Sequence, residues 1–386
     1  MSADARTPSL EALLAQRAVA TPFFDREADR IAELCRRCAE RFLRGGRLVA
    51  LGRSPQARSD ARHVAVEFVH PVIVGKRALP ALALCAEGGP LDRQARLALA
   101  PDDVVIAFEA GDRETAAALA VAAERGCETV AFAAVPATTA FAPPGEDRVR
   151  QEIAETLYHV VWELVHVVLE HRGTTAAGGG ASSFLYPFLS NDMRDDLDAV
   201  LADIARSVRR KAREVEQLRV ATVEGGAEAL HTAADVLRER LDGGGRVLAL
   251  GNGGSATDAM DVVADLRDAG RAALDLTEDT SIITAIANDV GVEAVFLRQV
   301  IAHGRDGDAL LAFSTSGGSP NVIAALAEAR RRGVHTVAFA GYDGGPIAAG
   351  QLADEVIVTP SQHIPRIQEA QATAYHALVD LIGASA

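Results

Sequence analysis

The stretch GGRVLALGNGGSATDAM (residues 244–260) runs from an unbroken apolar segment into glycines and a serine, and then into a helical pattern. An apolar run without alternation, followed by a helix, is typical of a strand in a parallel sheet covered on both faces. Glycines let the backbone approach a ligand closely, and amides at a helix start favour an anion. The stretch therefore predicts an α/β fold with an anion-binding turn. The turn contains neither GxxxxGK[ST] nor GxGxxG, so we expect no nucleotide cofactor.

The elements around this stretch occur twice in the chain, in the same order. GGRLVALG (45–52) matches GGRVLALG (244–251), and DDVVIAF (102–108) matches GDALLAF (307–313). ERGCETVAFAA (124–134) likewise matches RRGVHTVAFAG (331–341). A recurring set of elements indicates a repeated fold. We therefore predict two copies of one doubly wound domain, each a parallel sheet flanked by helices.

The junction between the copies is the small-residue, glycine-rich stretch RGTTAAGGGASS, which is typical of a flexible linker. We predict a first domain over 1–172, a linker over 173–183 and a second domain over 184–386. Apolar runs predict strands at 47–51, 103–108, 128–133, 246–250, 309–313, 335–340 and 355–358. Amphipathic segments predict helices at 27–44, 113–125, 146–171, 228–241, 320–332 and 364–383.

Composition excludes several classes of partner. A formal net charge of −14 and an aromatic content of 4% argue against a nucleic-acid partner, which needs basic surface and stacking rings. No uncharged apolar run approaches the roughly 20 residues that span a bilayer, and the start does not resemble a signal peptide. We expect a cytoplasmic protein with no membrane partner. Cys35 and Cys38 form a CxxC without a second pair, so we interpret them as helix-packing residues.

A second loop strengthens the prediction of an anion site. LLAFSTSGGSPN (310–321) leaves a predicted strand and enters a predicted helix with four hydroxyl side chains in six positions, namely Ser314, Thr315, Ser316 and Ser319. Hydroxyls and free amides at a helix start can cradle a phosphate without a lysine. A simple cap, with Ser319 at the N-cap and Pro320 in the first helical position, is the alternative. A cap uses one hydroxyl and leaves three.

These segments together resemble a known family. GNGGSATD (251–258), STSGGSPN (314–321), ANDVG (287–291) and RIQEAQATAYH (366–376) are similar to motifs of the sedoheptulose 7-phosphate (phosphoheptose) isomerases of the sugar isomerase (SIS) fold. The resemblance implies an aldose–ketose isomerase that converts sedoheptulose 7-phosphate into a heptose 7-phosphate. It assigns substrate binding to Asn252, Gly253, Ser255, Asp289, Ser314, Thr315, Ser316, Ser319 and Gln368.

In that family a glutamate and a histidine transfer the proton, and with a second histidine and a glutamine they can bind a metal, commonly zinc. The second domain keeps Gln368 and His376 but has Asp261 and Asp265 in place of the family's histidine and glutamate. An aspartate is one methylene shorter, and about 1 Å of misplacement can cost about 10²-fold in rate.

The first domain has the complementary pattern. Asp258, Asp261 and Asp265 follow Asp60, His63 and Glu67 by one constant interval, and Gln368 and His376 follow Gln151 and His159 by another. The resemblance thus implies a zinc site formed by His63, Glu67, Gln151 and His159. An exposed ion pair between His63 and Glu67 is the alternative.

The phosphate cradle, by contrast, is lost from the first domain. Its turn reads GRSPQARSD (52–60), and its hydroxyl loop has become FEAGDRET (108–115), in which Glu109 and Asp112 would repel a phosphate. No clear counterpart of ADEVIVTP (353–360) is found either.

Three interpretations stay open. In the first, the second domain holds the sugar phosphate while Glu67 and His159 of the first transfer the proton. In the second, Asp265 and His376 act as the acid/base pair and the first domain is a scaffold. In the third, the protein is a non-catalytic sugar-phosphate sensor or a protein-binding regulator. Because family members form tetramers, we expect a homodimer whose four domains imitate one.

Overall fold

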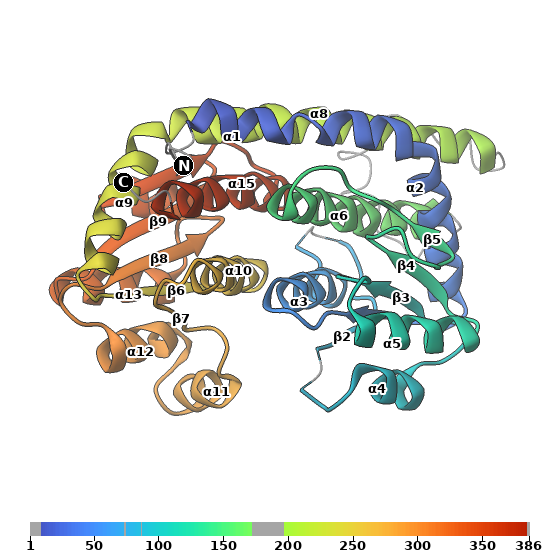
Figure 1. Ribbon diagram of the computed structural model, residues 1–386, viewed down its shortest axis with the longest axis horizontal. Coiled ribbons are helices and arrows are strands. Elements are labelled where there is room, and N and C mark those ends of the chain that lie inside the picture. The colour runs from blue at the N-terminus through green and yellow to red at the C-terminus, as the bar shows by residue number, and fades with distance from the viewer. Residues whose placement is uncertain (1–8, 73–74, 86, 172–196, 384–386) are drawn as a thin grey trace, which may run out of the picture. The chain divides into compact units, whose positions relative to one another are not determined.

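The computed structural model describes residues 9–72, 75–85, 87–171 and 197–383 (Figure 1). The described chain forms two compact units. The N-terminal unit runs from Ala18 to Glu214, and the C-terminal unit combines the segment up to Arg17 with the chain from Val215 onward. The predicted linker, 173–183, lies outside the described residues.

The N-terminal unit is built on a five-stranded parallel sheet in the order β2-β1-β3-β4-β5. Alternate residues of each central strand enter different cores: Leu48 and Ala50 pack with α2, α3 and α6, whereas Val49 and Leu51 pack with α4 and α5 (Figure 1). The elements are α2 (Ala20–Leu43), β1 (Leu48–Leu51), α3 (Pro55–Val69), β2 (Ala81–Leu84), α4 (Leu91–Ala98), β3 (Val104–Ala107), α5 (Arg113–Glu124), β4 (Glu128–Ala131), β5 (Thr139–Ala140), α6 (Asp147–His171) and the first part of α8 (Leu197–Gly225).

The C-terminal unit has the order β10-β9-β8-β6-β7, which is the same topology read from the other edge. Its strands also divide their residues between two cores. The elements are α1 (Leu10–Arg17), the rest of α8, α9 (Ala227–Asp242), β6 (Val247–Gly251), α10 (Gly254–Asp268), β7 (Ala273–Asp275), α11 (Thr280–Asp289), the 3₁₀ turn η2 (Val292–Ala294), α12 (Val295–His303), β8 (Ala309–Ser314), α13 (Pro320–Arg331), β9 (His335–Gly341), α14 (Gly345–Ala349), β10 (Glu355–Thr359) and α15 (Ile364–Gly383).

The two sheets confirm the predicted α/β fold, and their matching topologies confirm the repeat. All seven predicted strands and all six predicted helices are present within a few residues, except that α2 begins seven residues earlier, at Ala20. One sequence interpretation is corrected: β10 does have a counterpart in the N-terminal unit. This counterpart is β5, which pairs with β4 over only two residues and is therefore too short to recognise from a sequence pattern.

An arginine–aspartate pair recurs at the start of both sheets. In the N-terminal unit the backbone amide of Arg47 donates to Asp103, and its guanidinium lies 2.7 Å from Oδ2 of the same carboxylate. In the C-terminal unit the amide of Arg246 donates to Asp308, and the guanidinium distance is 3.5 Å. Each pair ties the start of the first strand of its unit to the start of a neighbouring strand, so the repeat extends from the apolar pattern to a specific polar contact.

The CxxC pair packs inside the N-terminal unit, as the sequence predicts. Cys35 and Cys38 are both buried in the core beside α2. Burial raises the pKa of both thiols, that of Cys38 to about 12, so both are protonated at neutral pH. None of the helices in the described part of the chain has the length and apolar character needed to cross a bilayer.

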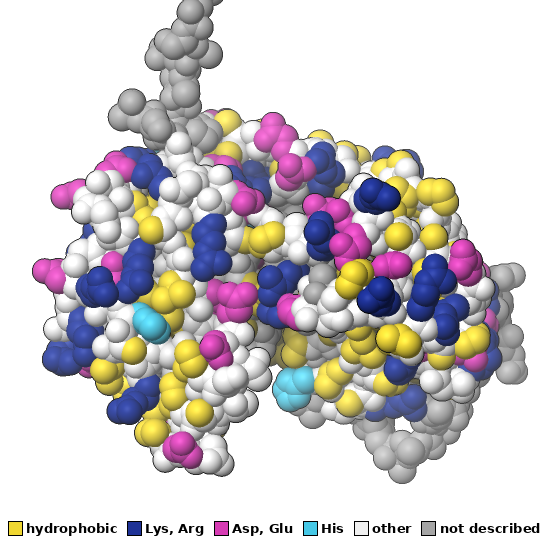
Figure 2. Space-filling view, turned by 60° about the horizontal axis from the view of Figure 1, so that its bottom comes forward, with side chains coloured by type: hydrophobic (Ala, Val, Ile, Leu, Met, Phe, Trp, Pro, Cys, Tyr) yellow, Lys and Arg dark blue, Asp and Glu magenta, His cyan; other side chains and the backbone are white. Residues whose placement is uncertain are grey.

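On the face shown in Figure 2, side chains of both charge signs are interspersed among apolar and uncharged ones. The described residues form no continuous basic patch on this face.

Candidate functional site

Two loops of the C-terminal unit leave neighbouring strands at the same edge of the sheet. β6 pairs in parallel with β8, with Gly251 opposite Phe313, so the glycine turn and the hydroxyl loop begin side by side. A Cβ atom on Gly251 would lie 2.1 Å from the carbonyl oxygen of Ser255, so a larger residue would push the turn apart. Gly253 has a φ of +58° at the start of α10, a conformation that favours glycine. The turn therefore needs both glycines.

The hydroxyl loop differs from a simple helix cap. Ser319 occupies the N-cap position of α13 and Pro320 its first turn, as the sequence predicts, but the Ser319 side chain makes no capping hydrogen bond. Its hydroxyl lies 3.1 Å from the hydroxyl of Ser314 instead. Ser316 is exposed and accepts a hydrogen bond from the amide of Gly318 (3.2 Å). The loop thus presents hydroxyl groups that the helix cap does not use.

The loop is held from behind by the chain that follows β9. Gly317 has a φ of +60°, and a Cβ atom there would lie 2.1 Å from the carbonyl oxygen of Gly344. The amide of Gly341 donates to the carbonyl of Thr315, and the amide of Ile347 donates to that of Gly317, both at 3.0 Å. These backbone contacts fix the loop before any ligand binds.

The two loops are also joined to each other. The side-chain amide of Asn252 donates to Asn321 (3.0 Å), and that of Asn321 donates back to Asn252 (2.8 Å). The remaining predicted substrate residues lie elsewhere in the unit. Ser255 is buried in the first turn of α10, and Gln368 is buried on α15. Asp289 is exposed at the end of α11 and accepts a hydrogen bond from the neighbouring Asn288 (2.7 Å).

The predicted acid/base residues of the C-terminal unit face one another between α10 and α15. Nε2 of His376 lies 3.8 Å from Asp261 and 3.8 Å from Asp265. The hydroxyl of Tyr375 donates to Asp261 (2.9 Å). All four side chains are buried. Both distances are longer than a hydrogen bond, so His376 lies near the two carboxylates but outside the range that direct proton transfer needs.

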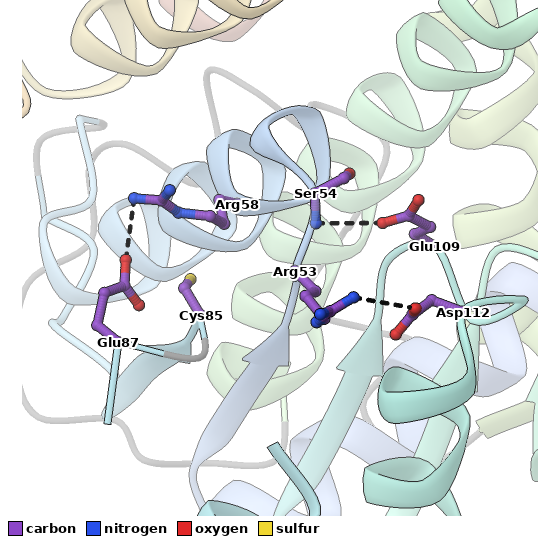
Figure 3. A pocket seen from close by; sticks show the side chains of 7 residues that line it. All are labelled: Arg53, Ser54, Arg58, Cys85, Glu87, Glu109 and Asp112. Carbon is purple, nitrogen blue, oxygen red and sulfur yellow. Dashed lines mark hydrogen bonds and ion pairs between the residues drawn. The ribbon is translucent and has the colours of Figure 1, made fainter. Parts of the chain in front are cut away.

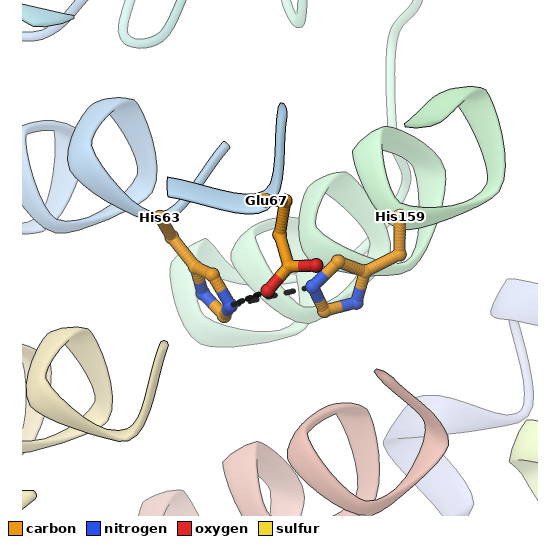
Figure 4. Close-up of side chains that lie close together, drawn as sticks. All are labelled: His63, Glu67 and His159. Carbon is orange, nitrogen blue, oxygen red and sulfur yellow. Dashed lines mark hydrogen bonds and ion pairs between the residues drawn. The ribbon is translucent and has the colours of Figure 1, made fainter. Parts of the chain in front are cut away.

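The N-terminal unit brings three predicted residues into a tighter group. Nε2 of His63 on α3 lies 3.3 Å from Nε2 of His159 on α6 and 3.9 Å from Oε1 of Glu67 (Figure 4). The hydroxyl of Tyr158 lies 3.0 Å from the other ring nitrogen of His63. His63, Glu67 and His159 are all at most 3% exposed. The exposed ion pair that the sequence left open is therefore wrong, because burial leaves these groups facing one another.

This group fits a zinc ion. One ligand atom from each of His63, Glu67 and His159 lies within 4.8 Å of the others. Two nitrogens bound about 2.0–2.1 Å from a tetrahedral zinc would be about 3.3–3.4 Å apart, which matches the distance between the two rings. Burial, and then the neighbouring His159, hold the pKa of His63 well below its usual value, so its ring is neutral, as a metal ligand must be. Gln151, the fourth predicted metal ligand, is half-buried on α6, about two helical turns before His159.

The anion loops of the N-terminal unit have a different structure. Ser54 caps α3 by accepting a hydrogen bond from the amide of Ala57, and Asp112 caps α5 by accepting from Glu114 and Thr115. The Oε2 atom of Glu109 accepts from the amide of Ser54 (3.2 Å). The carboxylate of Glu109 therefore accepts the hydrogen bond that the amide of Ser54 would otherwise donate to a bound anion.

The sequence is similar to proteins of known family. A family model described as "SIS domain" matches residues 212–341. A "Phosphoheptose isomerase" of Bradyrhizobium sp. (strain ORS 278) is 40% identical over 203 residues, which are 50% of this chain and 97% of that protein. The chain belongs to the phosphoheptose isomerase family.

Solved structures with lower identity extend the likeness in fold. The C-terminal domain of glucosamine-fructose-6-phosphate aminotransferase from Francisella tularensis is 9% identical, with a TM-score of 0.62 over 99% of this chain and 97% of that one. Tagatose-6-phosphate ketose/aldose isomerase from Escherichia coli is 16% identical, with a TM-score of 0.57 over 99% of this chain and 94% of that one. Unlike the phosphoheptose isomerase match, which covers half of the chain, these likenesses in fold cover both units.

Sequence reasoning missed three residues of this phosphoheptose isomerase family member. Tyr158 and Tyr375 each precede an aligned histidine, and their hydroxyls contact His63 and Asp261. The dipeptide Tyr-His at the same interval in both copies was a usable signal. Asn321, which pairs with Asn252, closes the motif STSGGSPN, and its place in that motif was a usable signal.

Proposed function

We propose that this chain is a sugar-phosphate isomerase that converts sedoheptulose 7-phosphate into an aldoheptose 7-phosphate. Support comes from its family and from the hydroxyl loop of the C-terminal unit. The observation that carries the proposal is that Ser319 points its hydroxyl at Ser314 and not at the first amides of α13. The Ser319 hydroxyl therefore lies with the other hydroxyls of the loop, and these groups can donate hydrogen bonds to the oxygens of a phosphate.

Phosphate binding falls to the C-terminal unit. Thr315, Ser316 and Ser319 supply hydroxyls, and the turn around Gly253 supplies backbone amides. The buried Ser314 positions Ser319. Because the backbone contacts of Gly317 and Thr315 fix the loop in advance, little ordering is required on binding.

Proton transfer has two candidate pairs, since the isomerisation needs a base to move a proton between the two carbons that share the carbonyl, and an acid to serve the oxygens. Glu67 and His159 are supported by their compact group and by a glutamate where the family has one. Asp265 and His376 are supported by lying in the same unit as the hydroxyl loop, 3.8 Å apart. We favour Glu67 and His159, because the shorter aspartate places its carboxylate about one bond further back.

His63, Glu67 and His159 would hold a zinc ion, with Gln151 as the fourth ligand that the family implies. When bound, zinc polarises a carbonyl oxygen and so favours loss of the neighbouring proton. Tyr158, hydrogen-bonded to the far nitrogen of His63, would fix the orientation of that ring.

A sensor without catalysis gains no support from the relatives, which are named as isomerases. We further propose that the chain forms a homodimer, which the mass from light scattering would test.

The direct test is turnover. We expect the purified full chain, supplied with zinc, to convert sedoheptulose 7-phosphate into an aldose phosphate that chromatography separates from the ketose. A chelator-treated sample shows whether the metal contributes. Binding without conversion would instead support the sensor, and the absence of both binding and conversion would refute both interpretations.

A further inference from the structure

The N-terminal unit contains a hollow of about 510 Å³ that the proposed function does not use. It opens at the carboxyl ends of β1, β2 and β3, and its lining side chains come from the loops after these strands and from the first turns of α3 (Figure 3). The volume falls in the range of small-molecule sites, about 300–1,000 Å³. The lining residues are Arg53, Ser54, Arg58, Cys85, Glu87, Glu109 and Asp112.

The hollow lies where the fold places a ligand. In the sheet, β2 lies on one side of β1, and β3 lies on the other. The order in which strands are added therefore reverses at β1, and the gap between β1 and β3 is a topological switch point. Ligands of open parallel sheets bind at such a switch point, outside the carboxyl ends of the strands. In the C-terminal unit the same point, between β6 and β8, carries the glycine turn and the hydroxyl loop.

Glu109 marks the difference between the two places. It follows Phe108 directly after β3, as Ser314 follows Phe313 in β8. Its φ is +54°, an unfavourable conformation for a residue other than glycine. In this conformation its carboxylate accepts a hydrogen bond from the amide of Ser54. A strained backbone that aims a side chain into a hollow is typical of a functional position.

The other charged side chains that line the hollow form ion pairs that do not include Glu109. Arg53 lies 3.4 Å from Asp112 and 3.1 Å from Glu114, and Arg58 lies 3.0 Å from Glu87. Glu109 forms no ion pair with any residue that the structure describes. An uncompensated carboxylate at the mouth of the hollow repels a phosphate.

The other lining groups suit hydroxyls. The two guanidinium groups donate hydrogen bonds, and the three carboxylates accept them. A sugar hydroxyl can do both, so a polyol satisfies such a lining without adding charge. Burial, together with the carboxylate of Glu87, raises the pKa of Cys85 to about 11, which keeps its thiol neutral and excludes a thiolate nucleophile at neutral pH.

We propose that this hollow binds an unphosphorylated polyhydroxyl compound, and that Glu109 is the residue that excludes phosphate from it. The N-terminal unit then has a ligand site of its own, distinct in chemistry from the phosphate loops of the C-terminal unit. The proposal does not depend on isomerase activity.

The test uses the full chain with sedoheptulose and inorganic phosphate as probes. Wild type, E109Q and E109S are compared with E124Q, which removes an exposed carboxylate at the far end of α5. Crystals soaked in each probe locate it, and calorimetry measures its affinity. We expect sedoheptulose in the wild-type hollow, about tenfold weaker binding in E109Q, since a charged acceptor is lost, and no change in E124Q.

Phosphate gives the opposite expectation. It should be absent from the wild-type hollow and enter it in E109S, or in E109Q if the serine variant does not fold. Phosphate in the wild-type hollow overturns the role of Glu109. Failure of sedoheptulose to bind there, or equal binding by wild type and E109Q, overturns the polyol site.

Discussion

The two units differ most where their chemistry would lie and least in the frame that supports it. Phe108 directly follows β3, and Phe313 occupies the matching position near the end of β8. The next residue carries a carboxylate in one unit (Glu109) and a hydroxyl in the other (Ser314). The helices that follow the first strands, α3 and α10, also differ. His63 and Glu67 of α3 align in sequence with two aspartates of α10, Asp261 and Asp265. The arginine–aspartate pair at the start of each sheet is kept.

The comparison shows which positions the fold constrains. Residues on β1 and β6 face apolar cores on both sides, so a polar replacement there would bury a polar group that has no hydrogen-bond partner. Loops at the carboxyl ends are only partly enclosed and can change their chemistry without that cost. A repeated fold can therefore divide anion binding and acid/base groups between its copies.

The strongest test of this comparison replaces one carboxylate by its amide, in the N-terminal unit in one variant and in the C-terminal unit in another. E67Q should lower kcat by about 10²–10⁴-fold, because the amide cannot accept the substrate proton, whereas D265N should stay within about tenfold of wild type. Initial rates with sedoheptulose 7-phosphate measure both variants. The reverse pattern would assign the chemistry to the C-terminal unit.

Zinc binding should depend on one unit alone. H63A should weaken zinc binding by more than about 100-fold, since loss of a ligand costs more than the 10–100-fold effect of an outer partner. H376A, which removes the histidine of the C-terminal unit that aligns with His159, should leave it unchanged. Competition with a chelator measures the affinity, and equal losses in the two variants would contradict a site confined to the N-terminal unit.

The arginine–aspartate pairs should contribute unequally to stability. D103N should lower the free energy of unfolding by about 2 kcal/mol, because the buried carboxylate loses its charge and its ion pair with the half-buried Arg47, whereas D308N, with its longer contact, should cost less. Urea denaturation of both variants measures this, and equal costs would contradict the geometric ranking.

The same variant has a pH dependence. Burial alone would raise the pKa of Asp103, but hydrogen bonds from Arg47 and from backbone amides outweigh it and lower the pKa. Its contribution is therefore present above the unfolded pKa, near 4, and is lost as pH falls through the lower folded value. D103N should show a smaller loss of stability than wild type over that acid range.

The smallest effect should come from the hydroxyl loop. S319A should raise KM for the sugar phosphate about tenfold, because one hydrogen bond from a hydroxyl to phosphate is lost while its neighbours remain. S54A removes the N-cap serine of α3 in the N-terminal unit and should leave KM unchanged, at a cost of about 1 kcal/mol in stability. An unchanged KM in S319A would remove Ser319 from the binding site.

Sequence patterns were enough for the central strands and for the grouping of His63, Glu67 and His159. Unbroken apolar runs indicate strands buried on both faces, and helical spacing places His63 and Glu67 on one side of α3. Their catalytic and metal roles stay predictions. β2 and β7 were not predicted, because four and three half-buried residues give little pattern.

Details that depend on rotamers or on distant chain could not be read from the sequence. Whether the Ser319 hydroxyl turns toward α13 or toward Ser314 is decided by a side-chain torsion. The support of Gly317 comes from Gly344, which belongs to another connection. The carboxylate of Glu109 was predicted to repel phosphate, but its hydrogen bond to Ser54 required the fold.

The place of α1 has a consequence for synthesis. Leu10 and Leu14 pack against a core that includes Leu378 and Val379 of α15. At about 5–20 residues per second, a ribosome needs roughly 20–70 s to travel from the first of these helices to the last. α1 therefore emerges long before the last helix of the core against which it packs, and the unit that contains the phosphate loops is completed only when α15 has been synthesised.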